Sequence, residues 1–281
     1  MLVAEPLVSA WKARLSLEFE PQFSPQGGRS ILSGRRHEGP LVVQKALHPE
    51  GPEVCHAIVV HPPGGIAGGD ELALDASVAP RAQALLTTPG AAKWYRSSGA
   101  WARQDVALDV RGRLEWLPQE TIVFDGALAR ASLRADLAAD AALIGWDLVC
   151  LGRTGSGERF RRGSYRMSAE VRREGRLLWR ERGRIDGGGP LLDSPAGLGG
   201  EPVFGTLFAA APALDAALLQ SAREARPEAG RGAVTRLPGI LLARYLGDST
   251  EAARGYFLKL WRVLRPALLG REAIEPRIWR T

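Results

Sequence analysis

The sequence predicts a mainly β protein that ends in a smaller helical part. Apolar and polar residues alternate with a period of two over several short segments, which is typical of half-buried strands. The 33 glycines and 19 prolines mark many turns between them. After about residue 186 the alternation gives way to a glycine-rich loop and helical periodicity. With 45% hydrophobic and 24% charged residues in 281 positions, the composition is not that of a disordered chain, a collagen or a coiled coil.

The predicted strands are of two kinds. Strands with one buried face are predicted where apolar residues alternate with polar ones, beginning with the apolar set Trp11, Ala13, Leu15, Leu17 and Phe19. The alternating segments are residues 11–19, 72–78, 106–110 and 165–171. Segments that are apolar almost throughout are predicted to be strands buried on both faces. These are residues 54–60 and 141–151.

A tight hairpin is predicted at Glu174-Gly175, which lies between two alternating runs. Many short strands separated by turn signals indicate a large β structure rich in antiparallel pairs. A regular solenoid is not indicated, since no repeat of fixed period is found.

The C-terminal part is predicted to be a loop followed by helices. Residues 187–200 are rich in glycine and proline, and residues 213–226 are rich in alanine and leucine. The clearest helix spans residues 248–264, with Asp248 as its cap, Glu251 completing a capping box and Pro266 ending it. One side of this helix is predicted to pack in the core or against a partner protein, because it carries an apolar stripe. The stripe consists of Tyr256, Phe257, Leu260, Trp261 and Leu264. We therefore expect a single domain over residues 1–281, with a β body at about 11–186 and a loop and helical part at about 187–281.

The net charge of +6 and the pI of about 9.8 raise the question of nucleic-acid binding. Residues 1–140 are close to neutral, so the basic excess lies in residues 141–281. Arg180, Arg182 and Arg184 alternate there, which places them on one face of a strand. A solvated strand face or a protein-docking rim is favoured over a nucleic-acid surface, because the sequence has no long Lys/Arg run.

A cytoplasmic location without a membrane anchor is predicted. The N-terminal stretch carries Glu5 where an export signal needs positive charge, and Pro6 interrupts its short apolar run. The longest charge-free stretch, residues 54–69, is too short to span a membrane. Cys55 and Cys150 are too few for a disulfide framework and are expected to be reduced.

Two segments that partly resemble phosphate-binding loops give little support for an enzymatic function. HPPGGIAGGD occupies residues 61–70, and the position of Asp70 favours a tight structural turn, or close approach of another chain, over a phosphate loop. LTTPGAAKWYRSSG, residues 86–99, has the wrong order and glycine spacing for a phosphate cradle. His56 and His61 lie five residues apart on a strand and therefore on opposite faces, so one metal site using both is not expected.

Acidic residues inside apolar strands are more informative. Asp147 and Glu181 follow tryptophans in such strands, while Glu120 and Asp125 follow other apolar residues. A buried carboxylate is costly unless it is paired, hydrogen-bonded or bound to a cation. A salt bridge to one of the many arginines is the simpler interpretation for any one of them. Several together leave a second interpretation open, a polar path or a transient cation site.

Five motifs in order resemble the urease accessory protein family called UreD, or UreH in some organisms. They are HPPGGIAGGD, LLTTPGAAKWYRS, LEWLPQETIVFDGA, GWDLVCLGRTGSGERF and PRIWRT. The likeness runs from about Trp11 to the C-terminus. It implies a mostly β, helix-like stack of sheets with a few helices, and a chaperone without enzymatic activity. Its implied partners are a helical UreF-like protein, a UreG-like P-loop GTPase and the urease subunits, with no nucleic acid and no membrane.

The resemblance also implies that Ni²⁺ passes through the protein in transit, with no tightly bound cofactor. Asp70, Asp147 and Glu181 match acidic positions of the family that resemble passage-lining residues. Carboxylate and imidazole ligands suit Ni²⁺, and transfer needs weak successive sites. The second-rank candidates for the same path are His61, Glu115, Glu120 and Asp125.

Two other classes of function stay open on the residues alone. A basic RNA-binding protein is suggested by the C-terminal charge, and its affinity would fall steeply with salt. A β-rich hydrolase is suggested by the carboxylates, and it would act on substrate without partners.

Overall fold

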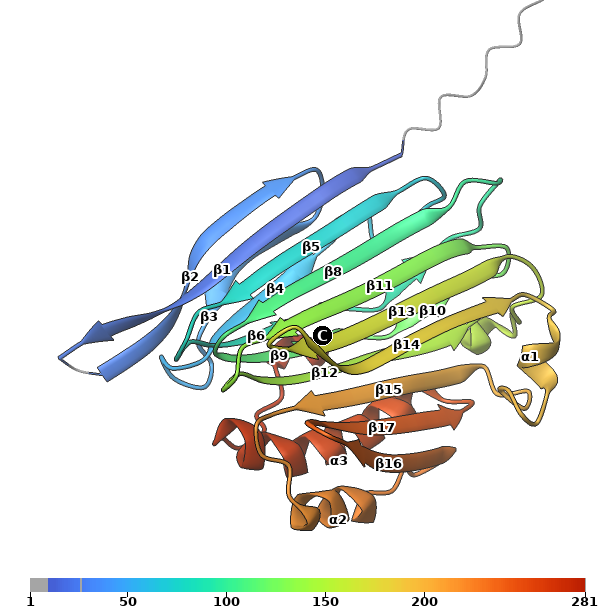
Figure 1. Ribbon diagram of the computed structural model, residues 1–281. Helices are drawn as coiled ribbons and strands as arrows, with labels where there is room; N and C mark the ends of the chain where they lie inside the picture. The colour runs from blue at the N-terminus through green and yellow to red at the C-terminus, as the bar shows by residue number, and fades with distance from the viewer. Residues whose placement is uncertain (1–9, 26, 281) are drawn as a thin grey trace, which may run out of the picture.

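The computed structural model describes residues 10–25 and 27–280 and consists of two large β-sheets with helices beside one of them (Figure 1). The seven-stranded sheet, here called sheet A, has the order β14 (Arg176–Asp186), β13 (Ser164–Arg173), β11 (Leu128–Leu137), β8 (Ala102–Val110), β5 (Glu71–Val78), β1 (Lys12–Ser24) and β2 (Gly27–Glu38). Residues 1–9, which bear on the expected absence of an export signal, and Thr281 of the last motif lie outside the described residues.

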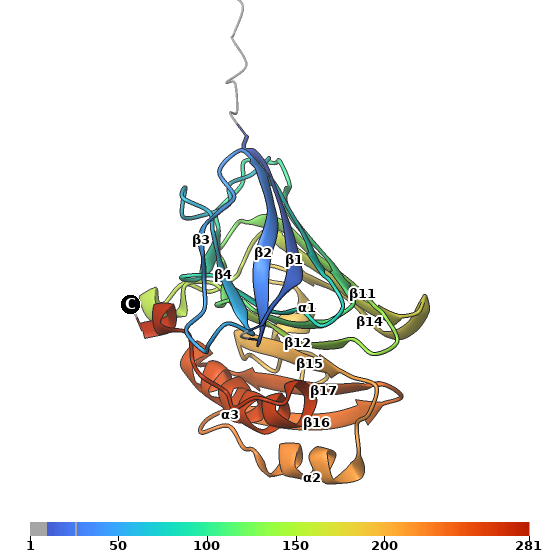
Figure 2. The same cartoon turned by 90° about the vertical axis from the view of Figure 1, so that its left-hand side faces the viewer.

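The second sheet, sheet B, has ten strands. Its main order is β16 (Arg231–Leu237), β17 (Ile240–Gly247), β15 (Val203–Ala210), β12 (Ala142–Leu151), β9 (Arg113–Leu117), β6 (Gln83–Thr87), β4 (Cys55–Val60) and β3 (Val42–Leu47). Two short strands branch from β12, namely β10 (Thr121–Val123) and, beyond it, β7 (Ala92–Trp94). Figure 2 shows the two sheets as facing layers, with β1 and β2 in one and β3 and β4 in the other.

The central strands form a coil in which the chain alternates between the sheets. β5, β8, β11 and β13 lie in sheet A, while β6, β9 and β12, which intervene in the chain, lie in sheet B. Successive turns of this coil therefore pair in parallel. The predicted fold class, a mainly β, stacked-sheet and β-helix-like body with few helices, is confirmed.

The expected antiparallel pairs occur at the edges of the sheets and among the last strands of sheet B, whereas the central strands pair in parallel, which the sequence did not predict. Alternation reports that a strand has one buried face; it does not report the direction of its neighbour.

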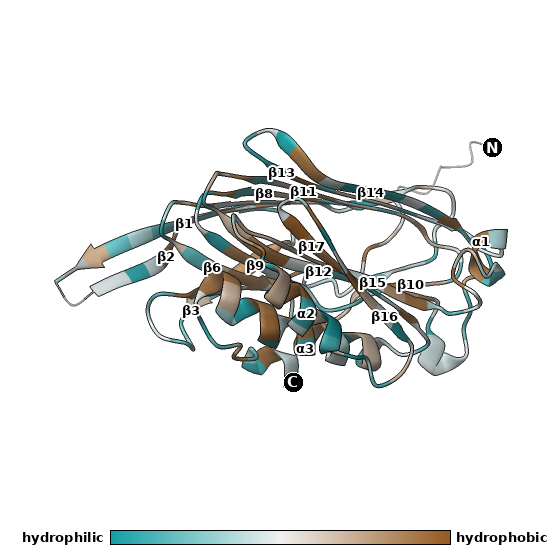
Figure 3. Ribbon diagram, turned by 60° about the horizontal axis from the view of Figure 1, so that its bottom comes forward, coloured by the Kyte–Doolittle hydropathy of each residue, from teal (hydrophilic) through white to brown (hydrophobic). Residues whose placement is uncertain are grey.

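The alternating segments are strands whose apolar side chains point between the sheets. Ala13, Leu15, Leu17 and Phe19 of β1 are buried, as are the matching residues of β5. Trp11, the first residue of the expected apolar set, is instead 49% exposed. It lies just before the first residue of β1. Figure 3 shows hydrophobic residues interspersed with hydrophilic ones along strands and helices.

Strand β12 is buried on both faces, as its apolar sequence predicts. Leu143, Val149 and Leu151 belong to the core between the sheets. Ile144 and Leu148, on the opposite face, belong to a second core shared with the helices. Asp147 lies on the same face of β12 as Leu143, Val149 and Leu151. Its carboxylate is therefore held between the two sheets, among apolar side chains.

We expect Gly145→Ala to lower the free energy of unfolding by about 1–3 kcal/mol, the usual cost of overpacking a core. A Cβ at Gly145 would lie 2.4 Å from Cζ of the buried Phe208 ring. Gly255→Ala is the matched control, because a Cβ there meets nothing within 4 Å and Gly255 lies in a helix. It should add about 1 kcal/mol. Urea unfolding measures both, and equal effects would contradict the packing argument.

The C-terminal part contains three strands in addition to the expected loop and helices. β15, β17 and β16 extend sheet B from β12 by antiparallel pairing. The helices are α1 (Pro190–Asp193), α2 (Ala216–Glu224) and α3 (Thr250–Leu269), with short 3₁₀ turns η1 (Thr154–Ser156) and η2 (Arg277–Arg280). In Figure 1, α2 and α3 lie on the side of sheet B away from sheet A.

Helix α3 differs from the sequence prediction at both ends. Its cap is Ser249, whose hydroxyl accepts the N–H of Ala252, and not Asp248. Pro266 lies inside the helix and does not end it. The helix continues because Gly270 donates its N–H to the Pro266 carbonyl in a left-handed cap, and because the next turn buries Leu269.

The hairpin between β13 and β14 is confirmed at the predicted position. Glu174 and Gly175 have φ values of 47° and 73°. Positive φ at both central residues is the type I′ arrangement that matches the twist of paired strands. None of the helices in the described part of the chain has the length and apolar character to cross a membrane.

Candidate functional site

A cavity of about 100 Å³ lies between the two sheets and is lined by two of the predicted acidic residues. Asp147 reaches it from β12 of sheet B, and Glu181 from β14 of sheet A. Gln104, Ser132 and Thr206 add polar groups to a wall that is otherwise largely apolar. The structure therefore brings together two residues that lie in strands distant in the sequence.

Asp147 is the most strongly perturbed carboxylic acid that lines this cavity. Burial between the sheets raises its pKa to about 6, and the neighbouring Glu181 carboxylate acts in the same direction, while a hydrogen bond from the Leu148 backbone opposes both. Desolvation disfavours the charged form of a buried acid. An approaching cation would favour that form, so Asp147 is suited to exchange a proton for a metal ion near neutral pH.

Glu181 is held across the gap between the sheets by an ion pair. Arg244 of β17 pairs with Glu181 and also donates to Thr206 Oγ1 at 2.7 Å. The Thr206 hydroxyl lies 3.5 Å from the second carboxylate oxygen of Glu181. The Trp179 ring packs against Phe208 with centroids 5.7 Å apart. The Glu181 side chain is 20% exposed, and the guanidinium of Arg244 compensates part of its negative charge.

A second cavity, of about 300 Å³, adjoins the first and shares part of its wall. The shared residues are Thr88, Ala92, Gln104 and Trp116. The first motif lines the second cavity through His61, Gly64 and Gly65. The second motif lines the same cavity through residues 88–93. The third and fourth motifs line the first cavity through Pro118, Gln119, Trp146 and Asp147. Four of the five motifs thus line these two adjoining cavities, which are together called the internal space below.

His61 and Asp70 have different positions relative to this space. His61 lines the second cavity, and among the described residues its Nε2 is a buried nitrogen without a hydrogen-bond partner. Burial lowers the pKa of His61, against the opposing effect of Asp70. An imidazole that is neutral at physiological pH can act as a metal ligand.

Asp70 closes a tight turn, as its motif predicts, but at 1% exposure its carboxylate is buried by that turn and not presented by it. Its two carboxylate oxygens accept the backbone N–H groups of Trp11 at 2.7 Å and Ala67 at 2.8 Å. Asp70 does not line either of the two cavities. Its negative charge acts on His61 of the second cavity, whose pKa it tends to raise.

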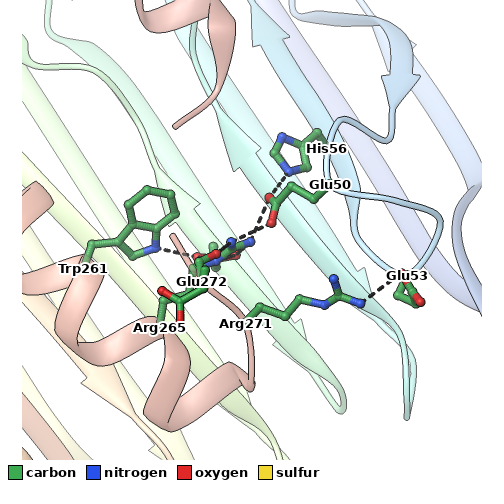
Figure 4. Close-up of polar contacts among 8 residues, drawn as sticks. Glu50, Glu53, His56, Trp261, Arg265, Arg271 and Glu272 are labelled. Carbon is green, nitrogen blue, oxygen red and sulfur yellow. Dashed lines mark hydrogen bonds and ion pairs between the residues drawn. The ribbon is translucent and has the colours of Figure 1, made fainter. Parts of the chain in front are cut away.

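Glu115 belongs to a buried charge network on the other side of sheet B, and Figure 4 labels its members Trp261, Arg265, Glu50 and His56. Its carboxylate accepts hydrogen bonds from Trp261 Nε1 at 2.6 Å and from Arg265 Nη2 at 3.0 Å. Arg265 also pairs with Glu50 at 2.6 Å, and Glu50 lies 2.6 Å from His56 Nε2. All of these side chains are almost fully buried. The network attaches α3 to β9 and to the loop before β4.

The two carboxylates of this network differ in their proton affinity. Complete burial raises the pKa of Glu115, against the opposing effect of Arg265. Burial also acts to raise the pKa of Glu50, but hydrogen bonds from His56 and Arg265 outweigh it, so that pKa is lowered. Glu115 is thus already supplied with donors from α3, which is the salt-bridge interpretation of a buried acid.

Asp125 and Glu120 line neither of the two cavities. Asp125 accepts the backbone N–H groups of Arg161 and Arg162, both at 2.8 Å, and pairs with the Arg162 side chain at 2.9 Å. Although burial opposes them, these contacts lower the pKa of Asp125. Glu120 precedes β10, and its carboxylate contributes to raising the pKa of Cys150, which is raised chiefly by burial.

The internal space offers isolated oxygen and nitrogen groups rather than a metal cage. No group of three or more His, Cys, Asp or Glu side chains placed to hold a metal ion occurs in residues 10–25 and 27–280. Isolated carboxylates and a neutral imidazole can each contribute one or two ligands, with water completing the coordination. Such sites bind a divalent cation weakly and release it readily.

Sequence reasoning missed Glu50, Arg265 and Arg244. The signal for Arg265 was present, because it interrupts the apolar stripe of α3 one residue after Leu264. Its partners Glu50 and Glu115 lie 215 and 150 residues away, so no local pattern could identify them. Arg244 likewise interrupts the apolar strand β17 and is 63 residues from Glu181.

Comparisons with known proteins give one consistent result. The family model of the UreD urease accessory protein matches residues 12–280. A urease accessory protein UreD of Azoarcus sp. (strain BH72) is 55% identical over 273 residues, covering 96% of this chain and 94% of that protein. The corresponding protein of Dechloromonas aromatica is 53% identical, with 97% and 95% covered, and that of Pseudomonas aeruginosa 54% identical, with 97% and 96% covered. The chain therefore belongs to the UreD family of urease accessory proteins, a family of accessory proteins rather than enzymes that takes part in urease maturation.

Proposed function

We propose that this protein is a cytoplasmic scaffold that helps deliver Ni²⁺ to apo-urease. It acts in a complex with a UreF-like protein and a UreG-like GTPase, and the ion passes through the space between its two sheets. Nickel is cargo here, with no tightly bound cofactor required. The observation that carries the proposal is the pair of adjoining cavities, lined by four of the motifs, with Asp147 and Glu181 in one and His61 in the other.

The polar groups along this space support stepwise movement of a hydrated cation. Among the described residues, Nε2 of His61 in the second cavity and the hydroxyl of Tyr165 in the core between the sheets are buried without hydrogen-bond partners, and unpaired buried groups of this kind are usually satisfied by water. Asp147 is close enough to Tyr165 to raise the pKa of the phenol, which burial raises in the first place. A path lined by single carboxylates and water holds Ni²⁺ weakly enough for onward transfer.

Co-expression of urease with its accessory proteins, with and without this chain, tests the function as a whole. Purified urease should contain nickel and hydrolyse urea only when the chain is present. Nickel is measured by mass spectrometry, and the amount of urease protein serves as the control for expression. Equal nickel content and activity in both preparations would refute the proposal. Recovery of the two accessory proteins and urease subunits with the tagged chain tests the assembly separately.

A further inference from the structure

A row of four arginines crosses the outer face of sheet A. The register of the parallel strands places Arg103 beside Arg130 and Arg130 beside Arg166, and the hairpin places Arg166 beside Arg184. All four side chains are exposed. Their sequence neighbours on the inner face, including Ala102, Ala129 and Tyr165, are buried between the sheets. Adjacent strands lie about 4.8 Å apart, so these guanidinium groups are close neighbours.

The two central arginines of this row have no close ion-pair partner in the described part of the chain, although Asp186 acts on Arg166 from a longer distance and Glu71 lies beside Arg103. Arg184 pairs with Asp186 at 3.0 Å, and Arg103 approaches Asp105 at 3.9 Å. Across residues 10–25 and 27–280, Arg130 and Arg166 have no carboxylate oxygen within the 4.0 Å limit of an ion pair. Like charges directly opposite each other destabilise a sheet. The repulsion is relieved when an anionic group binds over the row.

Three of the four arginines of this row also line a surface hollow of about 280 Å³. The hollow is lined by Glu71, Trp101, Ala102, Arg103, Arg130 and Arg166. The guanidinium of Arg166 lies over the Trp101 ring, 4.3 Å from its centroid. This contact holds the guanidinium at the edge of the hollow. Tryptophan and arginine are the residues most enriched among the energetic centres of protein interfaces.

We propose that the arginine row binds a short acidic segment of a partner protein, one that presents two or more carboxylates on one side. Arginine binds a carboxylate through two parallel N–H···O bonds, and lysine cannot do so. The positive charge of this face is concentrated in the row and in Arg182, two residues before Arg184 on β14, because several other arginines of the face are paired. Arg14 pairs with Asp75 and Arg134 with Asp136. A short segment matches this limited positive surface.

A nucleic-acid strand fits the same surface less well. A phosphate backbone would run on from the arginine row into the acidic groups beside it, including Glu71 and Asp186. Base stacking on Trp101 would compete with Arg166, which already lies over that ring. The observations therefore favour an acidic polypeptide, and binding of RNA is a competing outcome of the test.

Fluorescence anisotropy of a labelled hexaglutamate peptide with the full chain at low ionic strength tests the proposal. The double variant Arg130→Gln, Arg166→Gln should raise the Kd about tenfold, because it removes two charge-assisted contacts. The control is Arg134→Gln, which lies on the same strand and face as Arg130 but is paired with Asp136. It should leave the Kd within about twofold of the wild-type value, and added salt should weaken binding to the wild type.

Three results would overturn the proposal. One is no binding of hexaglutamate by the wild-type chain, and another is an equal loss in the Arg134→Gln control. The third is tighter binding of a labelled six-nucleotide RNA that the double variant also abolishes, which would make the surface a nucleic-acid site. The thermal midpoint of Arg130→Gln separates binding from folding. It should equal or exceed that of the wild type, since one of several neighbouring like charges is removed.

Discussion

Replacement of Arg265 by methionine should lower the free energy of unfolding by about 3–5 kcal/mol, the cost of breaking a buried ion pair from one side. Arg265 is fully buried and pairs with both Glu50 and Glu115. Methionine fills a similar volume but leaves two carboxylates without their cation. Urea unfolding at pH 7.5 measures the loss.

Two further variants show that the loss comes from the charge. Arg262→Met lies on the same helix but removes an exposed pair with Glu275, so it should cost less than about 1 kcal/mol. Adding Glu115→Gln to Arg265→Met should recover part of the loss, because it removes one uncompensated buried charge. Similar losses for Arg262→Met and Arg265→Met would show that the network contributes little.

Replacement of Asp147 by asparagine should stabilise the protein and at the same time impair nickel delivery. Burial raises the pKa of Asp147 from 3.8 to about 6, and Glu181 adds to the effect, so the ionised carboxylate destabilises the folded state. At neutral pH this destabilisation is about 2–3 kcal/mol, because a tenfold difference in proton affinity corresponds to about 1.4 kcal/mol. Asparagine has nearly the same shape without the charge. Urea unfolding and nickel content of co-expressed urease are the two measurements.

The pH dependence of the stability difference has a definite sign. The folded-state pKa lies above the unfolded one, so the folded state binds the proton more tightly and the cost is fully present only above about pH 6. The advantage of Asp147→Asn should therefore shrink as the pH falls from about 6 towards 4. Asp136→Asn, on an exposed strand position, is the control and should change neither urease nickel content nor this pH profile. Normal nickel delivery by Asp147→Asn would remove Asp147 from the path.

The candidate site was only partly predictable. Asp147, Glu181 and His61 were chosen from the sequence, and the structure places all three on the walls of the internal space. Asp70 and Glu115 were chosen with them, yet their carboxylates are occupied by backbone N–H groups and by Arg265. A sequence shows that an acidic residue lies in an apolar environment. It does not show which donor satisfies that residue, because the donor comes from a distant segment.

The sequence by itself determined several strands of the β body with their buried faces, the hairpin at Glu174-Gly175 and the family, because these depend on local periodicity, turn chemistry and ordered motifs. Tertiary structure alone decided the parallel coil, the extension of sheet B by three C-terminal strands and the pairing of each buried charge. The alternation of apolar and polar side chains shows which face of a strand is buried, but it does not show which strand pairs with it. Asp147 meets Glu181, and Arg265 meets Glu115, only because two sheets and a helix pack together.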